Sequence, residues 1–132
     1  MSISTAIVSR ISSNVASLSG KIFPENAPEG VDYPFMVYQL QTVERYQDLS
    51  GTPSTCPSAT FRFMLFSSSR SQVETLSNQV GGLFNGFRGM VGSQLIYTSS
   101  FDSQESNEVF IEGSDIPVYS YMNTHTIQFK ED

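Results

Sequence analysis

The sequence predicts a single α+β domain in which two amphipathic helices pack on one face of a mainly antiparallel, four-stranded sheet. Three observations predict this class. Apolar residues recur at helical spacing in two stretches, and four other stretches alternate in polarity or gather aromatic and β-branched residues. The order of these stretches is α-β-β-α-β-β, so each helix precedes a hairpin. A chain of 132 residues fits one domain, 1–132, with a buried core.

The first helix is predicted over residues 4–19. Apolar side chains fall on one face of it at helical spacing, while serines fill the opposite face. The apolar positions are Ile7, Ile11, Val15 and Leu18. Ser4 or Thr5 suits the N-cap, and Gly20 suits the first position after the helix. The many serines make this helix weak by itself, so packing must hold it.

A proline-rich loop leads to a strand predicted over residues 34–46. Pro34 suits the first position of a strand because it has no N–H to give to a ladder. We expect Phe35, Val37 and their neighbours to pack against the helices. The strand would be about twice the usual length of 5–6 residues, so its polar far end should project beyond the core. That end and the following segment 47–58 are therefore predicted to lie outside the core of the monomer.

The second strand is predicted over residues 59–66 and forms a hairpin with the first. Phe61, Phe63 and Leu65 share one parity and form an apolar face, whereas the other face is mixed. The segment between the two strands is rich in proline, serine and threonine, which is typical of a loop. It would form the tip of the hairpin.

The second helix is the clearest in the chain. Ser67–Ser71 offers several N-caps, and the apolar residues that follow keep helical spacing. These residues are Val73, Leu76, Val80, Leu83, Phe84 and Phe87. Gly81 and Gly82 each cost about 1 kcal/mol relative to alanine inside a helix, so their presence predicts either very close packing or a bend. Gly86 and the residues around it would end the helix.

The third strand is predicted over residues 93–101 and the fourth over 116–130, with an acidic segment between them. That segment contains no basic residue, and its carboxylates are Asp102, Glu105, Glu108, Glu112 and Asp115. It is either a solvated loop or a charged surface that faces a partner subunit or a channel. An acidic lining repels phosphates and would let a DNA duplex pass without binding.

Composition argues against several classes of protein. The formal net charge is −6 and the seven lysines and arginines are scattered, which disfavours a protein that grips nucleic-acid phosphates. No apolar run approaches the ~18 residues of a membrane span, and the N-terminus does not resemble a signal peptide. Cys56 is the only cysteine, which excludes an internal disulfide and a cysteine-based zinc site. We expect a protein of a reducing cytoplasm, or of an assembly built there.

No catalytic constellation is visible in the sequence. His125 is the only histidine and has no identifiable nucleophile or carboxylate partner, so a structural role is expected. There is no G-x-S-x-G motif, and the glycines after the second helix lie at its C-terminus, which is the wrong end of the dipole for a phosphate loop. Histidine-rich metal sites and D-x-D-x-D calcium loops are absent as well. We therefore expect no enzyme activity, no cofactor and no metal.

Several of these features together resemble one family. Pro24–Pro28 precedes the strand motif Pro34–Tyr38, which fits P-[FY]-x-V-Y. The aromatic strand Phe61–Leu65 precedes a helix that ends in an L-x-G-F-x-G-like turn at Phe84–Gly89, and the last strand closes on Ile-x-Phe at Ile127–Phe129. Over nearly its whole length, the chain resembles the tail-completion or tail-terminator proteins of long-tailed (siphovirus-type) bacteriophages and prophages.

The resemblance implies a structural role. Such proteins form rings, typically hexameric, on the head-proximal end of the tail tube, where they stop tube polymerisation and present a surface for joining the filled head. The implied partners are further copies of this chain, the tail tube protein and a head-completion or connector protein. DNA would pass through without specific binding, no membrane would be involved, and the protein would reside in the virion after assembly in the host cytoplasm.

Candidate contact residues follow from the long first strand and the segment after it. They are Thr42, Glu44, Arg45, Tyr46, Asp48 and Leu49. The acidic segment 102–115 would face the lumen or the head-side partner, and Tyr46→Ala is expected to weaken assembly while leaving the monomer folded. Two other functions stay open, namely a neck or head-closure protein with a related α+β fold and a small bacterial module that binds a peptide at a sheet edge.

Overall fold

The computed structural model describes residues 2–28, 30–45, 56–110 and 117–131, with the backbone alone for 107–110 and 117. Within these ranges the chain forms two α-helices, one short 3-10 helix and six strands. In chain order the elements are α1 Ile3–Asn14, η1 Ala16–Leu18, β1 Ile22–Pro24, β2 Phe35–Glu44, β3 Ser58–Ser67, α2 Arg70–Leu83, β4 Gly89–Val91, β5 Gln94–Phe110 and β6 Pro117–Phe129.

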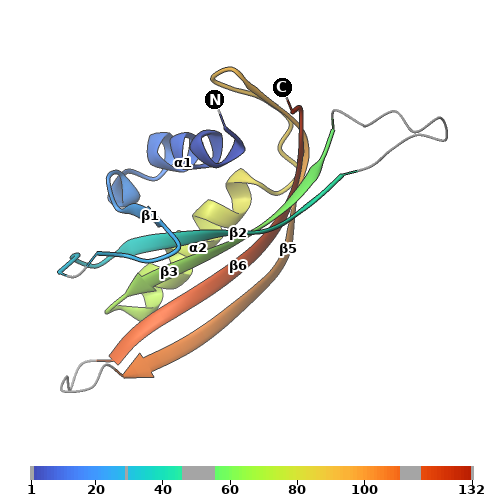
Figure 1. Ribbon diagram of the computed structural model, residues 1–132. Coiled ribbons are helices and arrows are strands. Elements are labelled where there is room, and N and C mark those ends of the chain that lie inside the picture. The colour runs from blue at the N-terminus through green and yellow to red at the C-terminus, as the bar shows by residue number, and fades with distance from the viewer. Residues whose placement is uncertain (1, 29, 46–55, 111–116, 132) are drawn as a thin grey trace, which may run out of the picture.

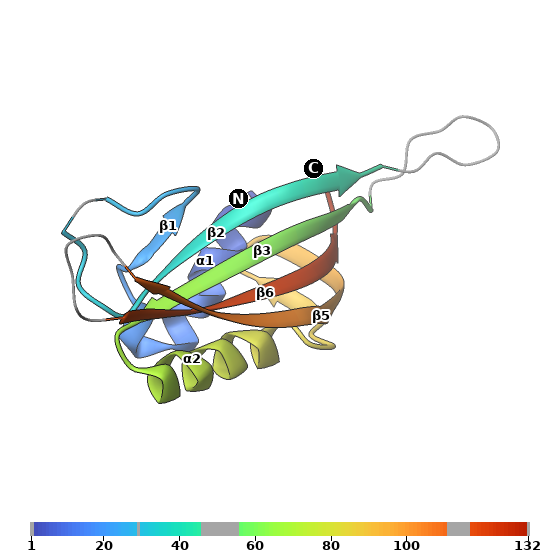
Figure 2. The same cartoon turned by 90° about the horizontal axis from the view of Figure 1, so that it is seen from below.

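All six strands belong to one sheet with the order β1-β2-β3-β6-β5-β4. The short strand β1 runs parallel to β2, and every other neighbouring pair is antiparallel. The long strands curve together like part of a barrel wall, and both α-helices lie on the hollow side of the curve (Figure 1). We call the side that carries the helices the concave face and the opposite side the convex face. Figure 2 shows β2, β3, β6 and β5 side by side.

The prediction of a mainly antiparallel four-stranded sheet with the order α-β-β-α-β-β was wrong. The sheet is mixed and has two further strands, β1 and β4, one at each end. Both are only three residues long, too short to show an alternating pattern. β1 exists because Ile22, Phe23 and Pro24 lie beside Met36, Val37 and Tyr38, and this long-range contact leaves no local signal.

The helices form where serine caps precede apolar stripes. Ser2 caps α1 by accepting a hydrogen bond from the backbone N–H of Thr5, which places the start before the predicted Ser4 or Thr5. Ser69 caps α2 through the N–H of Gln72. The buried residues of α1, α2 and the concave face form one core cluster. Its members include Ile7, Ile11, Leu18, Met36, Phe61, Phe63, Leu65, Val73, Val80, Phe84 and Ile127.

The predicted apolar face of the second strand is confirmed, but the predicted face of the first is wrong. Phe61, Phe63 and Leu65 are fully buried on the concave face. In β2 it is Met36 that joins this core, whereas Phe35 lies opposite Phe66 and stacks on it at 5.0 Å between ring centroids, on the convex face. Val37 is also on the convex side, opposite Met64. Because apolar residues occupy both parities of this strand, the sequence pattern could not decide which parity faces the helices.

The third predicted strand is much longer than expected. It was predicted to end at 101, but β5 continues to Phe110 by pairing with β6 along its whole length. Irregularities in register between Ile96 and Thr98 and between Phe101 and Ser103 let the long strand bend with the sheet. The acidic residues from 102 to 110 therefore lie on a strand, and the interpretation of this part as a solvated loop was wrong. The hairpin partner β6 matches the predicted fourth strand.

Candidate functional site

The far end of β2 holds the first group of predicted contact residues. Thr42, Glu44 and Arg45 are exposed, and Arg45 forms an ion pair with Glu131 near the C-terminus. Tyr46, Asp48 and Leu49, and hence the Tyr46→Ala prediction, lie outside the described residues. The exposed side chain of Leu40, at 39%, lies on the same strand. The described part of this end is thus a largely polar surface beyond the core.

The acidic residues are spread along β5 and its continuation. Asp102 and Glu105 are exposed, and Asp102 accepts hydrogen bonds from the hydroxyls of Ser100 and Thr126. Glu105 lies opposite Met122 on the convex face and has no hydrogen bond within the described ranges. The backbone of Glu108 lies in β5, whereas Glu112 and Asp115 are outside the described residues. The structure therefore places two of the five carboxylates and does not bring them together.

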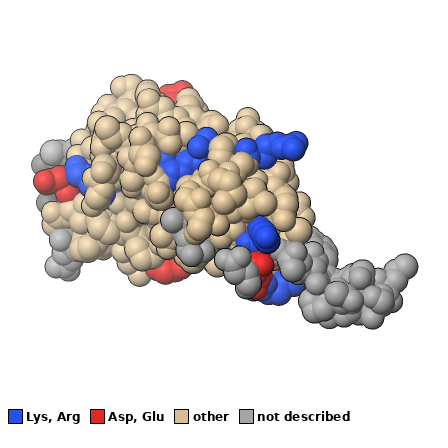
Figure 3. Space-filling view, turned by 90° about the horizontal axis from the view of Figure 1, so that it is seen from above, with Lys and Arg blue, Asp and Glu red and all other residues tan. Residues whose placement is uncertain are grey.

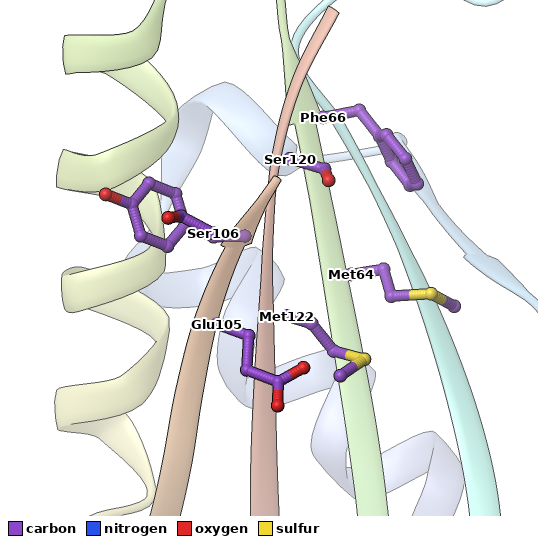
Figure 4. Close-up of a pocket in the computed structure, with 7 residues that line it drawn as sticks. Met64, Phe66, Glu105, Ser106, Ser120 and Met122 are labelled. Carbon is purple, nitrogen blue, oxygen red and sulfur yellow. The ribbon is translucent and has the colours of Figure 1, made fainter. Parts of the chain in front are cut away.

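An apolar strip crosses the convex face, on which no helix of the described residues lies. It consists of Phe35 on β2, Met64 and Phe66 on β3, and Met122 on β6, and all four side chains are half-buried. In Figure 4 the side chains of Met64, Phe66 and Met122 point away from α2, and Glu105 borders them on the same side. A shallow hollow runs between these side chains and Ser120.

A second hollow adjoins the first on the convex face. Its wall is formed by Glu25, Asn26 and Ala27, the residues that follow β1. Both hollows share Met64 and Phe66, so the strip is continuous from β2 to β6. Sequence analysis missed this surface because the second parity of β3 was judged only as mixed. A sheet that buries only one face would carry polar residues at these alternate positions. The large apolar residues Met64 and Phe66 there were therefore the signal that could have revealed the surface.

The concave face differs from an ordinary apolar core by a line of buried polar groups. The hydroxyl of Ser77 on α2 donates to Oδ1 of Asn123 at 2.7 Å, and Nδ2 of Asn123 donates to the carbonyl of Ser77 at 2.9 Å. Gln104 on β5 donates to the same hydroxyl at 2.6 Å and to Asn78 at 3.1 Å. These bonds attach α2 to two strands at a defined register, because an unpaired amide in this position would be costly.

His125 lies in the middle of the concave face and is fully buried. Its ring stacks on Phe101 at 4.7 Å and packs against Phe63 and Phe84. Nδ1 lies 3.4 Å from the carbonyl oxygen of Phe84, and Nε2 has no partner within the described ranges. Burial lowers the pKa of His125 from 6.5 to about 4, although the Phe84 carbonyl and the charge of Asp102 act in the opposite direction. This aromatic enclosure fits the structural role that the sequence predicted.

The structure explains why a glycine stands at position 81 of α2. A Cβ atom at this position would lie 2.1 Å from Cε2 of Phe101, so any larger residue would have to displace the Phe101 ring. A Cβ atom at Gly82 would meet nothing within 4 Å. The prediction of close packing is thus confirmed for Gly81 alone.

The charged residues form no dense patch on the face that Figure 3 shows. Lysines and arginines are dispersed there over an otherwise largely uncharged surface. Among the described residues there is no group of three or more histidine, cysteine or acidic side chains that could hold a metal ion. No helix in the described ranges has the length and apolar character needed to cross a membrane.

Comparison with known proteins adds information on the fold. No protein-family model matches the sequence, and no curated protein matches it. The structure is similar to a chain in the solved virion of a native gene transfer agent (GTA) particle, with a TM-score of 0.73 and 10% sequence identity. The match covers 97% of this chain and 94% of that chain.

The chain shares its fold with a virion component. The match extends over nearly all of both chains, so the similarity is not confined to the elements that the sequence predicted. The likeness is one of fold, and the 10% identity carries no residue-level correspondence. The convex strip and the two ends of the sheet are therefore assessed from this structure alone.

Proposed function

We propose that the chain is a structural protein of a virion, and that it acts as a tail-completion or tail-terminator protein. The observation that carries the proposal is the fold shared over 97% of the chain with a component of a virion. The family resemblance of the sequence points in the same direction. In this role the protein forms a ring, typically of six subunits, at the head-proximal end of the tail tube and stops the polymerisation of the tube.

The described surfaces support a role in contacts between proteins. Among the described residues, no element covers the four large apolar side chains of the convex strip, and the far end of β2 exposes polar groups. Further copies of this chain, the tail tube protein and a head-completion or connector protein are the proposed partners. Interface geometry, with no bond chemistry, would then perform the function.

The charge of the protein supports free passage of DNA through the ring. With a net charge of −6 and dispersed basic residues, the subunit has little means to hold a duplex by its phosphates. The exposed carboxylate of Asp102 would repel DNA wherever it faces it. We place the protein in the virion, at the head-proximal end of the tail.

Electron microscopy of particles made with and without the protein tests the proposed role. Without it, tails should be of irregular or excessive length and should fail to join heads, and adding purified protein should restore joining. Tails of normal length in its absence would contradict tail termination. Binding to isolated heads, but not to isolated tails, would instead identify a neck or head-closure protein.

A further inference from the structure

β2 and β5 are the outermost long strands of the sheet, and most of the outer edge of each lies beyond the short strands β1 and β4. β5 pairs with β4 only from Gln94 to Ile96, and beyond this the one backbone bond on that side among the described residues runs from the N–H of Gly86 to the carbonyl of Ser99. β2 pairs with β1 only from Met36 to Tyr38, so on the side away from β3 no described strand lies beside Gln39 to Val43. Unpaired strand edges of this kind are templates for pairing with another chain.

The directions of the strands decide how two such edges can meet. β2, β3, β6 and β5 are successively antiparallel, so β2 and β5 run in opposite directions (Figure 2). If a second copy is placed beside the first by rotation, with its strands in the same orientation, its β2 lies antiparallel to β5 of the first copy. The alternation of the sheet then continues from one molecule into the next.

The β5 edge is acidic, and one basic side chain lies one strand in from the β2 edge. The β5 edge carries Asp102 and Glu105, and β5 contains no basic residue. On the β2 side, Arg62 of β3 lies opposite Gln39, and its Nε atom is buried without a hydrogen-bond partner in the described ranges. Glu105 and Arg62 both lie on the convex face, since Glu105 pairs with Met122 and Arg62 pairs with Thr124.

We propose that the open edge of β5 binds the open edge of β2 in a second copy of this chain, as an antiparallel continuation of the sheet. Opposing Glu105 to Gln39 of the next copy places Arg62 of that copy two strand spacings away, about 10 Å, within reach of two long side chains. Each copy uses a different edge for each neighbour, so the contact is head-to-tail, and it generates a ring where the rotation from one copy to the next closes. The inference names the subunit contact of the proposed ring and rests on that proposed function.

Chemical cross-linking between two single-cysteine variants tests the contact. In a Cys56→Ser background, Ser103→Cys and Gln41→Cys place thiols on exposed residues near each other across the pairing, and the length of the linker accommodates the irregular register of β2 between Leu40 and Thr42. A mixture of the two variants, treated with a short bis-maleimide, should give dimers, and each variant alone should not. A chain with both substitutions should give a ladder of higher oligomers. As a matched control, Ser103→Cys mixed with Ser13→Cys, which is exposed on α1, should stay unlinked.

Several outcomes overturn the pairing. They are efficient cross-linking of either variant alone, equal linking in the control mixture, and no linking at the highest concentration that the protein reaches. A charge exchange gives a second readout. Arg62→Glu and Glu105→Lys should each weaken self-association up to about fivefold, and the chain with both should regain most of the affinity. A double variant as weak as the singles would also overturn the pairing.

Tail length separates this inference from the proposed function. A protein that terminates tails but fails to cross-link through these edges would refute only the pairing. A protein that cross-links as expected but leaves tail length unchanged when removed would refute only the tail-terminator role.

Discussion

The two faces of the sheet use the same kinds of residue for different purposes. On the concave face, Phe61 and Phe63 lie fully buried beneath two helices, and a line of polar side chains sets the register of α2. On the convex face, Phe35 and Phe66 stack on each other, and neither of the two described α-helices covers them. The contrast teaches that aromatic content alone does not locate a core, because coverage by a second layer decides which face stabilises the monomer.

The largest expected contrast is between Phe63→Ala and Phe66→Ala, two identical substitutions on opposite faces of β3. Phe63 is fully buried against Phe84 and His125, so its truncation should cost about 3–5 kcal/mol of unfolding free energy. Phe66 is only half-buried, and its truncation should cost roughly half as much or less. Chemical denaturation measures both values. Equal losses of unfolding free energy would show that Phe66 on the convex face stabilises the monomer as much as Phe63 in the core.

Acidification should lower the free energy of unfolding through His125, which lies on the concave face. The pKa of His125 is about 4 in the folded state and 6.5 when unperturbed, so the unfolded chain takes up the proton first as pH falls. The contribution of neutral His125 is therefore complete above about pH 6.5 and is lost progressively down to about pH 4, a total of about 3 kcal/mol. His125→Leu should lack this component.

The pH dependence can be isolated by subtraction. Stability is measured by denaturation for both proteins between about pH 7 and pH 4, and the difference between the two curves removes most of the titration of surface carboxylates. A difference that stays constant over this range would show that the imidazole is not held neutral by its aromatic enclosure.

A smaller contrast distinguishes two neighbouring glycines on α2. Gly81→Ala should destabilise the protein by about 1–3 kcal/mol, because the new methyl group overlaps Phe101, which is itself held against His125. Gly82→Ala should stabilise it by up to about 1 kcal/mol, since the position is open and alanine favours the helix. Thermal unfolding of the two variants gives the comparison. Similar effects from both would mean that α2 can move away from β5.

The sequence predicted most elements but not their assembly. Helical spacing located both helices, although the first was predicted over 4–19 and α1 ends at Asn14, with Leu18 in the separate η1. Alternation located β3 with its correct buried face, because Phe61, Phe63 and Leu65 are separated by more polar neighbours. In β2 the run Phe35-Met36-Val37 is apolar at every position, so its inward face could not be assigned. The extension of β5 was missed since serine, aspartate and glutamate have low strand propensity, and pairing with β6 overrides it.

The candidate surfaces were predicted only in part. Thr42, Glu44 and Arg45 are polar, and this polarity predicted that they would be exposed at the far end of β2. The convex strip and the open edges depend on which strands become neighbours, and residues distant in sequence such as Phe35, Phe66 and Met122 reveal no shared surface until the register is known.

The two described ends of the chain meet at the same end of the molecule (Figure 1). Ser2 and Ile3 line one hollow together with Arg45, Lys130 and Glu131. A bulky fusion at either terminus would therefore crowd the far end of β2 and leave the opposite end of the molecule clear. In an electron micrograph such a fusion would also act as a direction marker, since extra density from either terminus would report the same pole of each subunit.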